Sequence, residues 1–320
     1  NNWVGDTLPV PGDNVKITDP AAPNDPVIST NDAVDLGTGA VDVDADSFTI
    51  NNGGTLTSGG SSVGENAAGT AIVTGKNSTW NTTAMNVGVS YAGTLTIADG
   101  GKVSSTVGLI GREGFPGFFT GDGTVKVTGT DSTWAISGDL TFGFLSGGIG
   151  TLTIAEGGTV TVAGNTTIAR SAGAGGAPDS TGTLNIGSAA GVAPVAPGTF
   201  SSSSLAFGAG DGRLTFNHTD LSKNFAFDPA ISGKGMIDHL AGYTTLTGDS
   251  SGFTGTMTVD GGTLAIQNKL GGDVSVMSKG TLVFNPSSPQ TLTYGGEISG
   301  SGRVEQAGTG VTVLSGANSY

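Results

Sequence analysis

Three aspartates near the start of the chain have the spacing that points most directly to chemistry. Asp42, Asp44 and Asp46 stand at positions i, i+2 and i+4, so on a β-strand their carboxylates share one face. Such a face could bind a hard cation such as Ca²⁺, which prefers oxygen ligands. The alternative, which we favour, is a solvated and self-repelling face that discourages edge-to-edge pairing at the exposed end of the fold.

Hydrolytic chemistry has little support in the sequence. Gly248–Gly252 and Gly60–Gly64 fit the pattern G-x-S-x-G, but a chain with 58 Gly produces such matches by chance. The two histidines, His218 and His239, precede Ser250 by too few residues for a His–Asp–Ser triad. We expect both to be hydrogen-bonded turn or strand residues. Two isolated histidines and no Cys also make a zinc site improbable.

Composition and charge narrow the possible partners. The 320 residues carry a net charge of −14, and only 12 are Lys or Arg. Because duplex affinity comes largely from neutralisation of phosphates, nucleic acid and anionic lipid are disfavoured partners. Residues 1–46 hold nine Asp and one Lys, which is −8 of the total, so an electrostatic partner meets that end first.

Internal repeats predict the elements that position these residues. Gly93–Val103 recurs as Gly150–Val160 after 57 residues, and Gly69–Trp80 returns as Gly123–Trp134 after 54. Repetition at a fixed spacing is typical of a solenoid. Within each copy apolar residues alternate with Thr, as in Leu95 to Ile97, which indicates strands with one buried face.

The sequence therefore predicts an all-β fold, and we favour a right-handed parallel β-helix. The 54–57 residue unit divides into about three turns of 18–19 residues, which gives roughly 15 turns along the chain. The frequent Gly residues supply corners where the backbone needs positive φ. A narrow interior needs only small and medium apolar side chains, which explains the hydrophobic content of 36%.

Several segments resemble the passenger region of bacterial autotransporters, the type V secreted surface proteins. Gly300–Tyr320 is similar to the passenger-associated repeat, with a hydrophobic strand followed by Leu-Ser-Gly-Ala-Asn-x-Tyr, and Tyr243–Gly255 is a degenerate copy. Asn2–Ile17 is similar to a first coil of such proteins. The resemblance implies a β-helix at the bacterial cell surface or outer membrane, or secreted, that is exported through a C-terminal barrel absent from this chain.

We expect a single β-helical passenger fragment over residues 1–320. Its expected parts are acidic N-terminal coils (1–68), two copies of the 54–57 residue repeat (69–187), an irregular loop (188–204) and C-terminal coils with passenger-associated repeats (205–320).

A loop between the two repeat copies is the predicted contact site. Arg112, Glu113, Phe115, Phe118 and Phe119 lie in a Gly- and Pro-containing segment, and aromatic and Arg residues on loops often dominate binding. The alternative is that these Phe side chains fold back to cover the apolar interior. Further irregular stretches at 173–178 and 189–204 are also expected to protrude.

The function that best fits these observations is a non-enzymatic surface adhesin. Expected partners are a host cell-surface or extracellular-matrix protein or glycan, or a second copy of the chain, with many weak contacts summing along the rod. Alternatives are a polysaccharide-active β-helix enzyme or a stalk that displays an upstream binding region. The enzyme is disfavoured because the four arginines, at 112, 170, 213 and 303, are far apart in the sequence. No cofactor is expected, Ca²⁺ aside.

Overall fold

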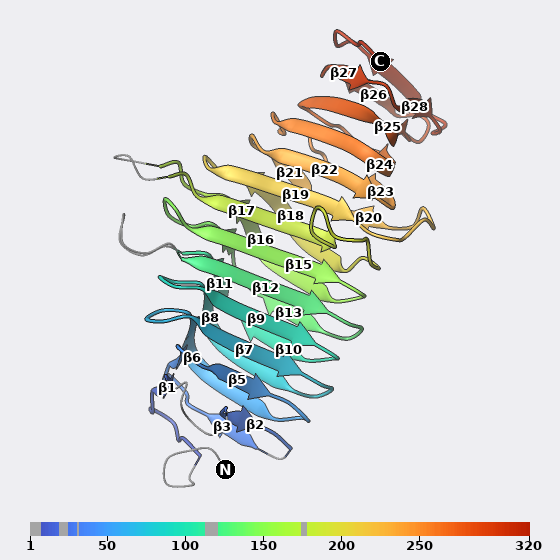
Figure 1. Cartoon of the computed structure of the whole chain (residues 1–320). Coiled ribbons are helices and arrows are strands. Elements are labelled where there is room, and N and C mark those ends of the chain that lie inside the picture. Colours follow the sequence, from blue (N-terminus) through green and yellow to red (C-terminus); the bar gives the residue numbers. More distant parts are fainter. Residues whose placement is uncertain (1–7, 19–24, 31, 113–120, 174–177) are drawn as a thin grey trace.

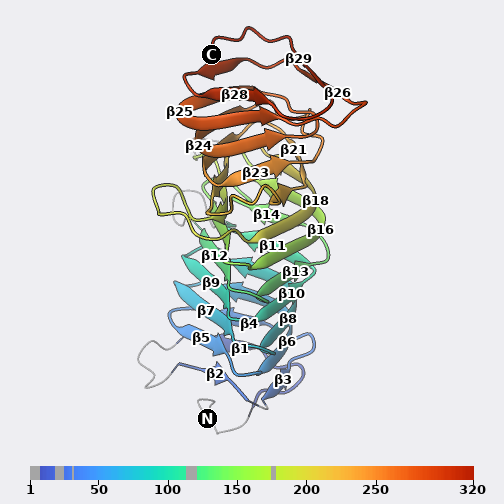
Figure 2. The same cartoon turned by 90° about the vertical axis from the view of Figure 1, so that its right-hand side faces the viewer.

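Parallel strands, stacked one turn above the next, build an elongated rod (Figures 1 and 2). The computed structural model describes residues 8–18, 25–30, 32–112, 121–173 and 178–320. These residues contain no helix, and hence none long and apolar enough to cross a membrane. The predicted all-β class is confirmed.

Two large sheets run along the rod, and a small third sheet lies near its C-terminal end. The first sheet contains β1 (Val15–Ile17), β3 (Ala33–Asp35), β4 (Val41–Val43), β6 (Thr55–Val63), β8 (Thr79–Val87), β10 (Lys102–Ser105), β11 (Val107–Ile110), β13 (Thr133–Ile136), β14 (Leu140–Phe142), β16 (Thr159–Ile168), β18 (Thr199–Phe207) and β21 (Ala230–Ser232).

The second sheet contains β2 (Val27–Ile28), β5 (Ser47–Ile50), β7 (Gly69–Thr74), β9 (Gly93–Ala98), β12 (Asp122–Thr128), β15 (Ile149–Ala155), β17 (Thr181–Gly187), β19 (Asp211–Asn217), β20 (Ala226–Phe227), β22 (Met236–Ala241), β23 (Tyr243–Leu246), β24 (Thr256–Ile266), β25 (Asp273–Phe284), β27 (Ile298–Gly300) and β28 (Arg303–Gln306). The third sheet pairs β26 (Thr291–Tyr294) with β29 (Val311–Leu314).

The direction of the strands gives the handedness of the coil. In Figure 1 the near strands, such as β9, β12 and β15, run from left to right while successive turns rise from the N-terminal to the C-terminal end. The strands of neighbouring turns pair in parallel, as β9, β12 and β15 do. A parallel coil that advances in this way is right-handed, as is usual for parallel crossovers. The predicted right-handed parallel β-helix is confirmed.

The turns are longer than the sequence repeat predicted. Gly69, Gly93, Gly123, Gly150 and Gly182 pair in register from β7 to β17, so each step from one glycine to the next is one turn. The step from Gly93 to Gly150, which is one full repeat unit, therefore contains two turns and not the predicted three shorter ones. Fewer turns than predicted fit in the chain as a consequence. The difference arises because segments between the strands, such as 88–92 and 143–148, lengthen each turn.

Each of these glycines is required by a close approach of the backbone. A Cβ atom built on Gly93 would overlap the carbonyl oxygen of Val63 and the amide nitrogen of Gly88, both at the preceding corner. A Cβ on Gly123 would overlap the carbonyl oxygen of Val87 in the same way. Since backbone atoms cannot move aside as a side chain can, the column accepts only glycine.

The interior is filled by columns of apolar side chains that stack in register. One column in the first sheet is buried throughout and consists of Val34, Leu56, Trp80, Val103, Trp134, Val160 and Phe200. A column in the second sheet consists of Val73, Ile97, Val127, Ile154, Ile186, Phe216, His239, Val259 and Val276. The alternation of apolar and polar residues predicted from sequence produces these columns.

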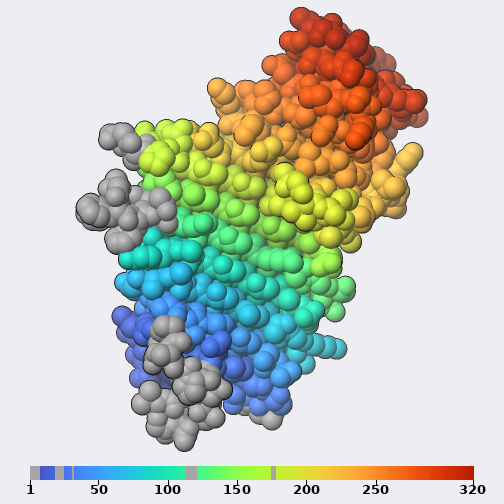
Figure 3. All heavy atoms as spheres, in the orientation of Figure 1, coloured from blue at the N-terminus to red at the C-terminus, as the bar shows by residue number. Residues whose placement is uncertain are grey.

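Two parts of the chain depart from a straight and regular coil. The C-terminal turns are offset from the axis of the N-terminal turns (Figure 3). The stretch 188–204 was expected to be irregular throughout, but β18 begins at Thr199 and continues the first sheet. The part before it is held to the rod because the side-chain amide of Asn217 donates hydrogen bonds to the carbonyl oxygens of Ala189 and Val192.

Candidate functional site

An open groove of about 700 Å³ runs along the first sheet, across the strands β6, β8, β10, β13, β16 and β18. Figure 2 shows β6, β8, β10, β13 and β16 stacked one above the next. The groove is lined by Gly37, Thr57, Ser58, Asn81, Thr82, Thr83, Ser104, Ser105, Thr106, Ala135, Ile136, Ser137, Thr161, Val162, Ala163 and Ser201. It therefore spans many turns of the coil.

Strand register explains why so many small polar residues meet in this groove. The outward-facing row Thr57, Asn81, Ser104, Ala135, Thr161 and Ser201 stacks in register across six strands. Five strand spacings correspond to about 24 Å along the rod axis. The rows repeat because each strand contributes the residue that follows its buried Trp, Val, Leu or Phe.

The lining of the groove has hydroxyl and amide groups but no charge. Most of the lining residues are Ser, Thr or Asn, and none is Asp, Glu, Lys, Arg or His. Ser104 Oγ donates to Asn81 Oδ1 at 2.6 Å, which links two neighbouring turns. General acid–base catalysis needs a titratable group within hydrogen-bond reach of the substrate. The groove lining offers none.

Buried polar contacts hold the floor of the groove. The indole nitrogen of Trp80 donates to Ser58 Oγ at 3.2 Å, and that of Trp134 donates to Ser105 Oγ at 3.1 Å. Both indole rings are completely buried. Because rotation of either ring would leave a buried donor without an acceptor, these bonds fix the position of the serines.

The predicted loop site is only partly described. Glu113, Phe115, Phe118 and Phe119 lie outside the described residues. Arg112 is described and exposed, and its backbone nitrogen donates to the carbonyl oxygen of Gly88 at 2.8 Å. Its position at the corner after β11 agrees with a loop residue.

Two further residues share the corner of Arg112 on the following turns. The backbone nitrogen of Phe144 donates to Gly111, and that of Arg170 donates to Gly143, in the same way as Arg112 donates to Gly88. The guanidinium carbon of Arg170 lies 4.4 Å from the centroid of the Phe144 ring. We call Arg112, Phe144 and Arg170 the arginine column. The arginines at 112 and 170, far apart in the sequence, thus lie two turns apart on one corner.

The three aspartates considered as a candidate calcium site do not lie on one strand face. Strand β4 ends at Val43, and Ala45 has a φ of 60°, so Asp42, Asp44 and Asp46 do not continue one strand face. Asp44 is buried, and its carboxylate accepts hydrogen bonds from the backbone nitrogens of Glu65 and Asn66. Among the described residues, no three His, Asp or Glu side chains are placed to hold a metal ion.

Asp42 lies near the carboxylates of Glu65 and Asp44. Burial is the main reason that the pKa of Asp42 is raised above its ordinary value, and the charge of Glu65 adds to the effect.

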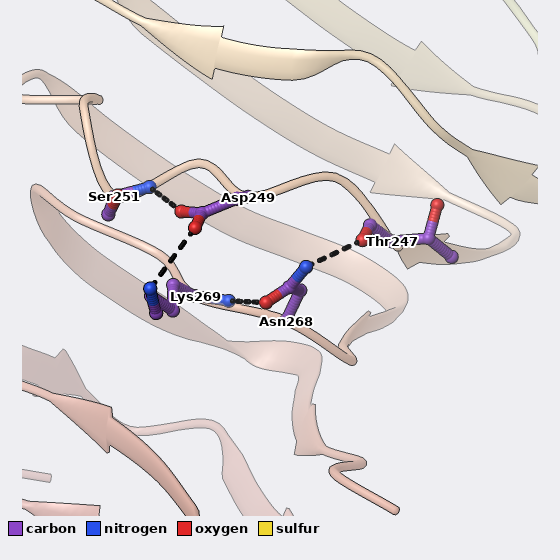
Figure 4. Close-up of polar contacts among 5 residues, drawn as sticks. All are labelled: Thr247, Asp249, Ser251, Asn268 and Lys269. Atoms are coloured by element: carbon purple, nitrogen blue, oxygen red, sulfur yellow. Dashed lines mark hydrogen bonds and ion pairs between the residues drawn. The ribbon is translucent and has the colours of Figure 1, made fainter. Parts of the chain in front are cut away.

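The segment Gly248–Gly252 has a structural role. Ser250 is buried, and its hydroxyl accepts a hydrogen bond from the backbone nitrogen of Ile231 at 3.2 Å. Asp249 accepts from the backbone nitrogen of Ser251 at 3.1 Å and forms an ion pair with Lys269 at 3.2 Å (Figure 4). The hydrogen bonds from Ser251 hold the pKa of the Asp249 carboxyl below its usual range. These contacts join neighbouring turns, and Ser250 is not free to act as a nucleophile.

Both histidines are buried in the interior and meet at one hydroxyl. His218 Nε2 lies 2.8 Å and His239 Nε2 lies 3.2 Å from Thr244 Oγ1. His239 Nδ1 lies 2.8 Å from the carbonyl oxygen of Gly261, whereas His218 Nδ1 is buried with no hydrogen-bond partner among the described residues. Burial lowers the pKa of each histidine to about 4. The expectation of satisfied histidines therefore holds for His239 and is wrong for one nitrogen of His218.

The chain has relatives among known bacterial proteins. It is 33% identical over 276 residues to the Adhesin BmaC autotransporter of Brucella suis biovar 1 (strain 1330), which is 75% of this chain and 7% of that protein. The chain is a relative of autotransporter adhesins. The resemblance found in its repeats is thereby confirmed.

Two proteins of Escherichia coli (strain K12) are also similar to the chain. The Uncharacterized lipoprotein YdeK is 31% identical over 225 residues, which is 68% of this chain and 16% of YdeK. The Uncharacterized protein YuaQ is 28% identical over 246 residues, which is 73% of this chain and 16% of YuaQ. The chain spans less than a fifth of the length of each of these curated relatives. An autotransporter and a lipoprotein agree with the expected place at the bacterial cell surface or outer membrane, or among secreted proteins.

One solved structure resembles the chain. It is the crystal structure of a TibC-catalyzed hyper-glycosylated TibA fragment, with 14% sequence identity and a TM-score of 0.34 over 94% of this chain and 98% of that chain. No protein-family model matches the chain.

Proposed function

We propose that this chain is a non-enzymatic adhesive part of an autotransporter passenger. It attaches the bacterial cell to a host cell or to the extracellular matrix, or to a second copy of the chain on a neighbouring cell. The observation that carries the proposal is the similarity to an autotransporter adhesin over 75% of the chain.

The exposed surfaces support attachment through many separate contacts. The groove presents hydroxyl groups along about 24 Å of the rod. The arginine column presents a guanidinium stacked on an aromatic ring, and Arg and aromatic side chains often dominate interface energies. Contacts that repeat along a rigid rod act together, so weak individual contacts give useful avidity.

The alternative of a polysaccharide-active enzyme finds little support at these surfaces. Glycoside hydrolysis commonly uses two carboxyl groups on either side of the bond that breaks. The groove lining contains no carboxyl group. The alternative of a stalk that only displays an upstream binding region predicts that no surface of this chain affects adhesion.

An adhesion experiment separates these alternatives. The full-length protein is displayed on bacteria, and adhesion to cultured epithelial cells, to immobilised fibronectin and to itself is measured. Two variants, called the loop variants below, test the corner that carries the predicted loop and the arginine column, here called the loop corner. One is deletion of 111–119, and the other combines Arg112→Ala with Arg170→Ala. The matched control is Lys126→Ala, because Lys126 is also exposed and cationic but lies on the second sheet.

We expect both loop variants to reduce adhesion several-fold while the control retains it. Surface display is measured with an antibody so that lost export is not mistaken for lost binding. Unchanged adhesion in both loop variants would remove the loop corner from the proposal. The stalk alternative is correct if bacteria adhere normally whichever of the surface variants they display. These variants include the groove variants described below.

A further inference from the structure

The groove on the first sheet has a shape and a chemistry that together define one class of ligand. Most of its lining residues come from six strands that pair one after the next, so the groove extends along the rod axis. An occupant that follows it would pass from turn to turn and meet the same row of side chains at each. The ligand must therefore be long, unbranched and repetitive.

The charge of the lining excludes ionic ligands. None of the lining residues is charged, so a carboxylate, sulfate or phosphate entering the groove would lose water without meeting a counter-charge. At the N-terminal end of the row, Asp35 pairs in register with Thr57, and one oxygen of its carboxylate accepts from the backbone nitrogen of Gly37. This carboxylate would repel an anionic ligand further.

The polar groups of the lining match a neutral ligand rich in hydroxyl groups. Ser and Thr hydroxyls both donate and accept, and the side chain of Asn81 does the same through separate atoms. Between them, Ala135, Val162 and Ala163 and the methyl groups of Thr provide apolar contact. A sugar ring presents the same mixture, with hydroxyl groups at its rim and C–H groups on its faces.

The spacing of the rows favours one sugar unit for each turn. Neighbouring strands lie about 4.8 Å apart, and a sugar unit in an extended glycan is about as long as this spacing. The six residues of the outward row, from Thr57 to Ser201, would then contact about six sugar units. The buried indoles of Trp80 and Trp134 fix the floor, so the site is rigid before binding.

We propose that the groove binds a neutral, unbranched oligosaccharide lying along the rod axis, about one sugar unit for each turn. This proposal rests on the proposed adhesive function and names the ligand class of one surface. The groove binds without cleaving, because it has no acid or base to transfer a proton. Without an aromatic platform, each sugar contributes little, and affinity grows with the length of the glycan.

The test uses the purified chain and hexasaccharides of stated chemistry. The neutral probes are the linear hexamers of β-1,4-glucose, β-1,3-glucose, α-1,4-glucose and β-1,4-N-acetylglucosamine, and the charged probe is hexagalacturonic acid. Binding is measured by isothermal titration calorimetry and by saturation-transfer NMR. We expect at least one neutral hexamer to bind, its trimer to bind at least tenfold more weakly, and hexagalacturonic acid not to bind.

Variants place the ligand in the groove. Ala135→Arg, which puts a bulky charge in the middle of the outward row, is expected to lower the affinity at least tenfold. Its control is Thr124→Arg on the preceding strand β12, which makes an equally exposed change on the second sheet. Should Ala135→Arg not fold, as judged by circular dichroism, Thr161→Val removes one hydroxyl without changing the shape and is expected to lower the affinity about threefold.

The outcomes also separate this proposal from the adhesive function. Failure of all four neutral hexamers to bind, or equal binding of hexagalacturonic acid, overturns the neutral-glycan site. If Ala135→Arg leaves glycan binding unchanged but abolishes self-association in analytical ultracentrifugation, the occupant is a second copy and the glycan proposal is wrong. If the cells still adhere although the chain binds no glycan, the proposal of a glycan site in the groove is wrong and the proposed adhesive function stands.

Discussion

The replacement His218→Gln tests whether the buried His218 is neutral in the folded chain and destabilises it at low pH. Because the carbonyl oxygen of Gly261 only accepts, His239 carries its proton on Nδ1 and accepts from the Thr244 hydroxyl at Nε2. The Thr244 oxygen then accepts from His218 Nε2, and His218 Nδ1 has no hydrogen-bond partner within the described part of the chain. Gln reaches Thr244 with its amide but cannot be protonated in the same pH range.

The size of the effect follows from the pKa of the folded state. The pKa of His218 falls from 6.5 to about 4, and burial is the main cause. Between these values the unfolded chain binds a proton and the folded chain does not, so stability is complete above pH 6.5 and is lost as the pH falls toward 4. A pKa lowered by this much corresponds to about 3 kcal/mol of folding free energy for this histidine.

The assay compares the free energy of unfolding of the native chain and of His218→Gln at pH 7, 6, 5 and 4. Guanidinium unfolding is followed by circular dichroism, and hydrogen exchange of amides in 211–266 reports on the turns around the histidines. The carboxyl groups titrate in both proteins, so their contribution cancels in the difference. The native chain should lose about 3 kcal/mol more than the variant between pH 7 and pH 4. A difference that does not change with pH would refute the reasoning.

Three further predictions concern the packing of the coil. Gly93→Ala should lower the free energy of unfolding by about 2–3 kcal/mol or prevent folding, whereas Gly60→Ala, with open space around its Cβ position, should change it by less than about 1 kcal/mol in thermal unfolding. Asp44→Asn should lower it by about 1–3 kcal/mol through the weakened bonds to Glu65 and Asn66, and calcium should shift the melting temperature of neither protein; a calcium shift only in the native chain would restore the metal site. Trp134→Phe should lower it by about 1–2 kcal/mol, because Ser105 loses its donor, with fluorescence and denaturant titration as the measurement.

The fold was predictable because its repeats lie in register. Gly93, Gly123 and Gly150 lie at or next to the first residue of equivalent strands, and apolar residues at alternate positions after them stack in the interior. The length of a turn was not predictable in the same way. The period of the repeat fits three short turns or two long ones, and only the pairing of Gly93 with Gly123 decides between them.

The surfaces depended on features that local sequence does not carry. Alanine rarely adopts a positive φ, so the turn at Ala45, which follows the end of β4 at Val43 and stands between Asp44 and Asp46, had no signal in the sequence. The groove was missed because residues that are neighbours in its outward row, such as Thr161 and Ser201, are far apart in the sequence and unevenly spaced. The signal that could have found it is a Ser, Thr or Asn directly after the buried residue of successive turns.

His239 shows how one position can escape a pattern that is otherwise regular. It stands in an interior column whose other members are Val, Ile and Phe, directly between Phe216 and Val259. The sequence predicted only a hydrogen-bonded turn or strand residue here and did not indicate that the ring would lie in the interior. The hydroxyl of Thr244, later in the same turn, and the carbonyl oxygen of Gly261, on the next turn, allow it to be buried.

The continuous glycine column has a consequence for how this protein changes over generations. Every turn from β7 to β19 has a glycine at the same corner, so neighbouring turns of this part of the rod pair there in the same register. Unequal recombination between the repeated DNA segments can add or remove a two-turn segment while keeping this register. Each event would change the length of the rod by about 9.6 Å, so the reach of the molecule can vary between strains while its surface chemistry stays the same.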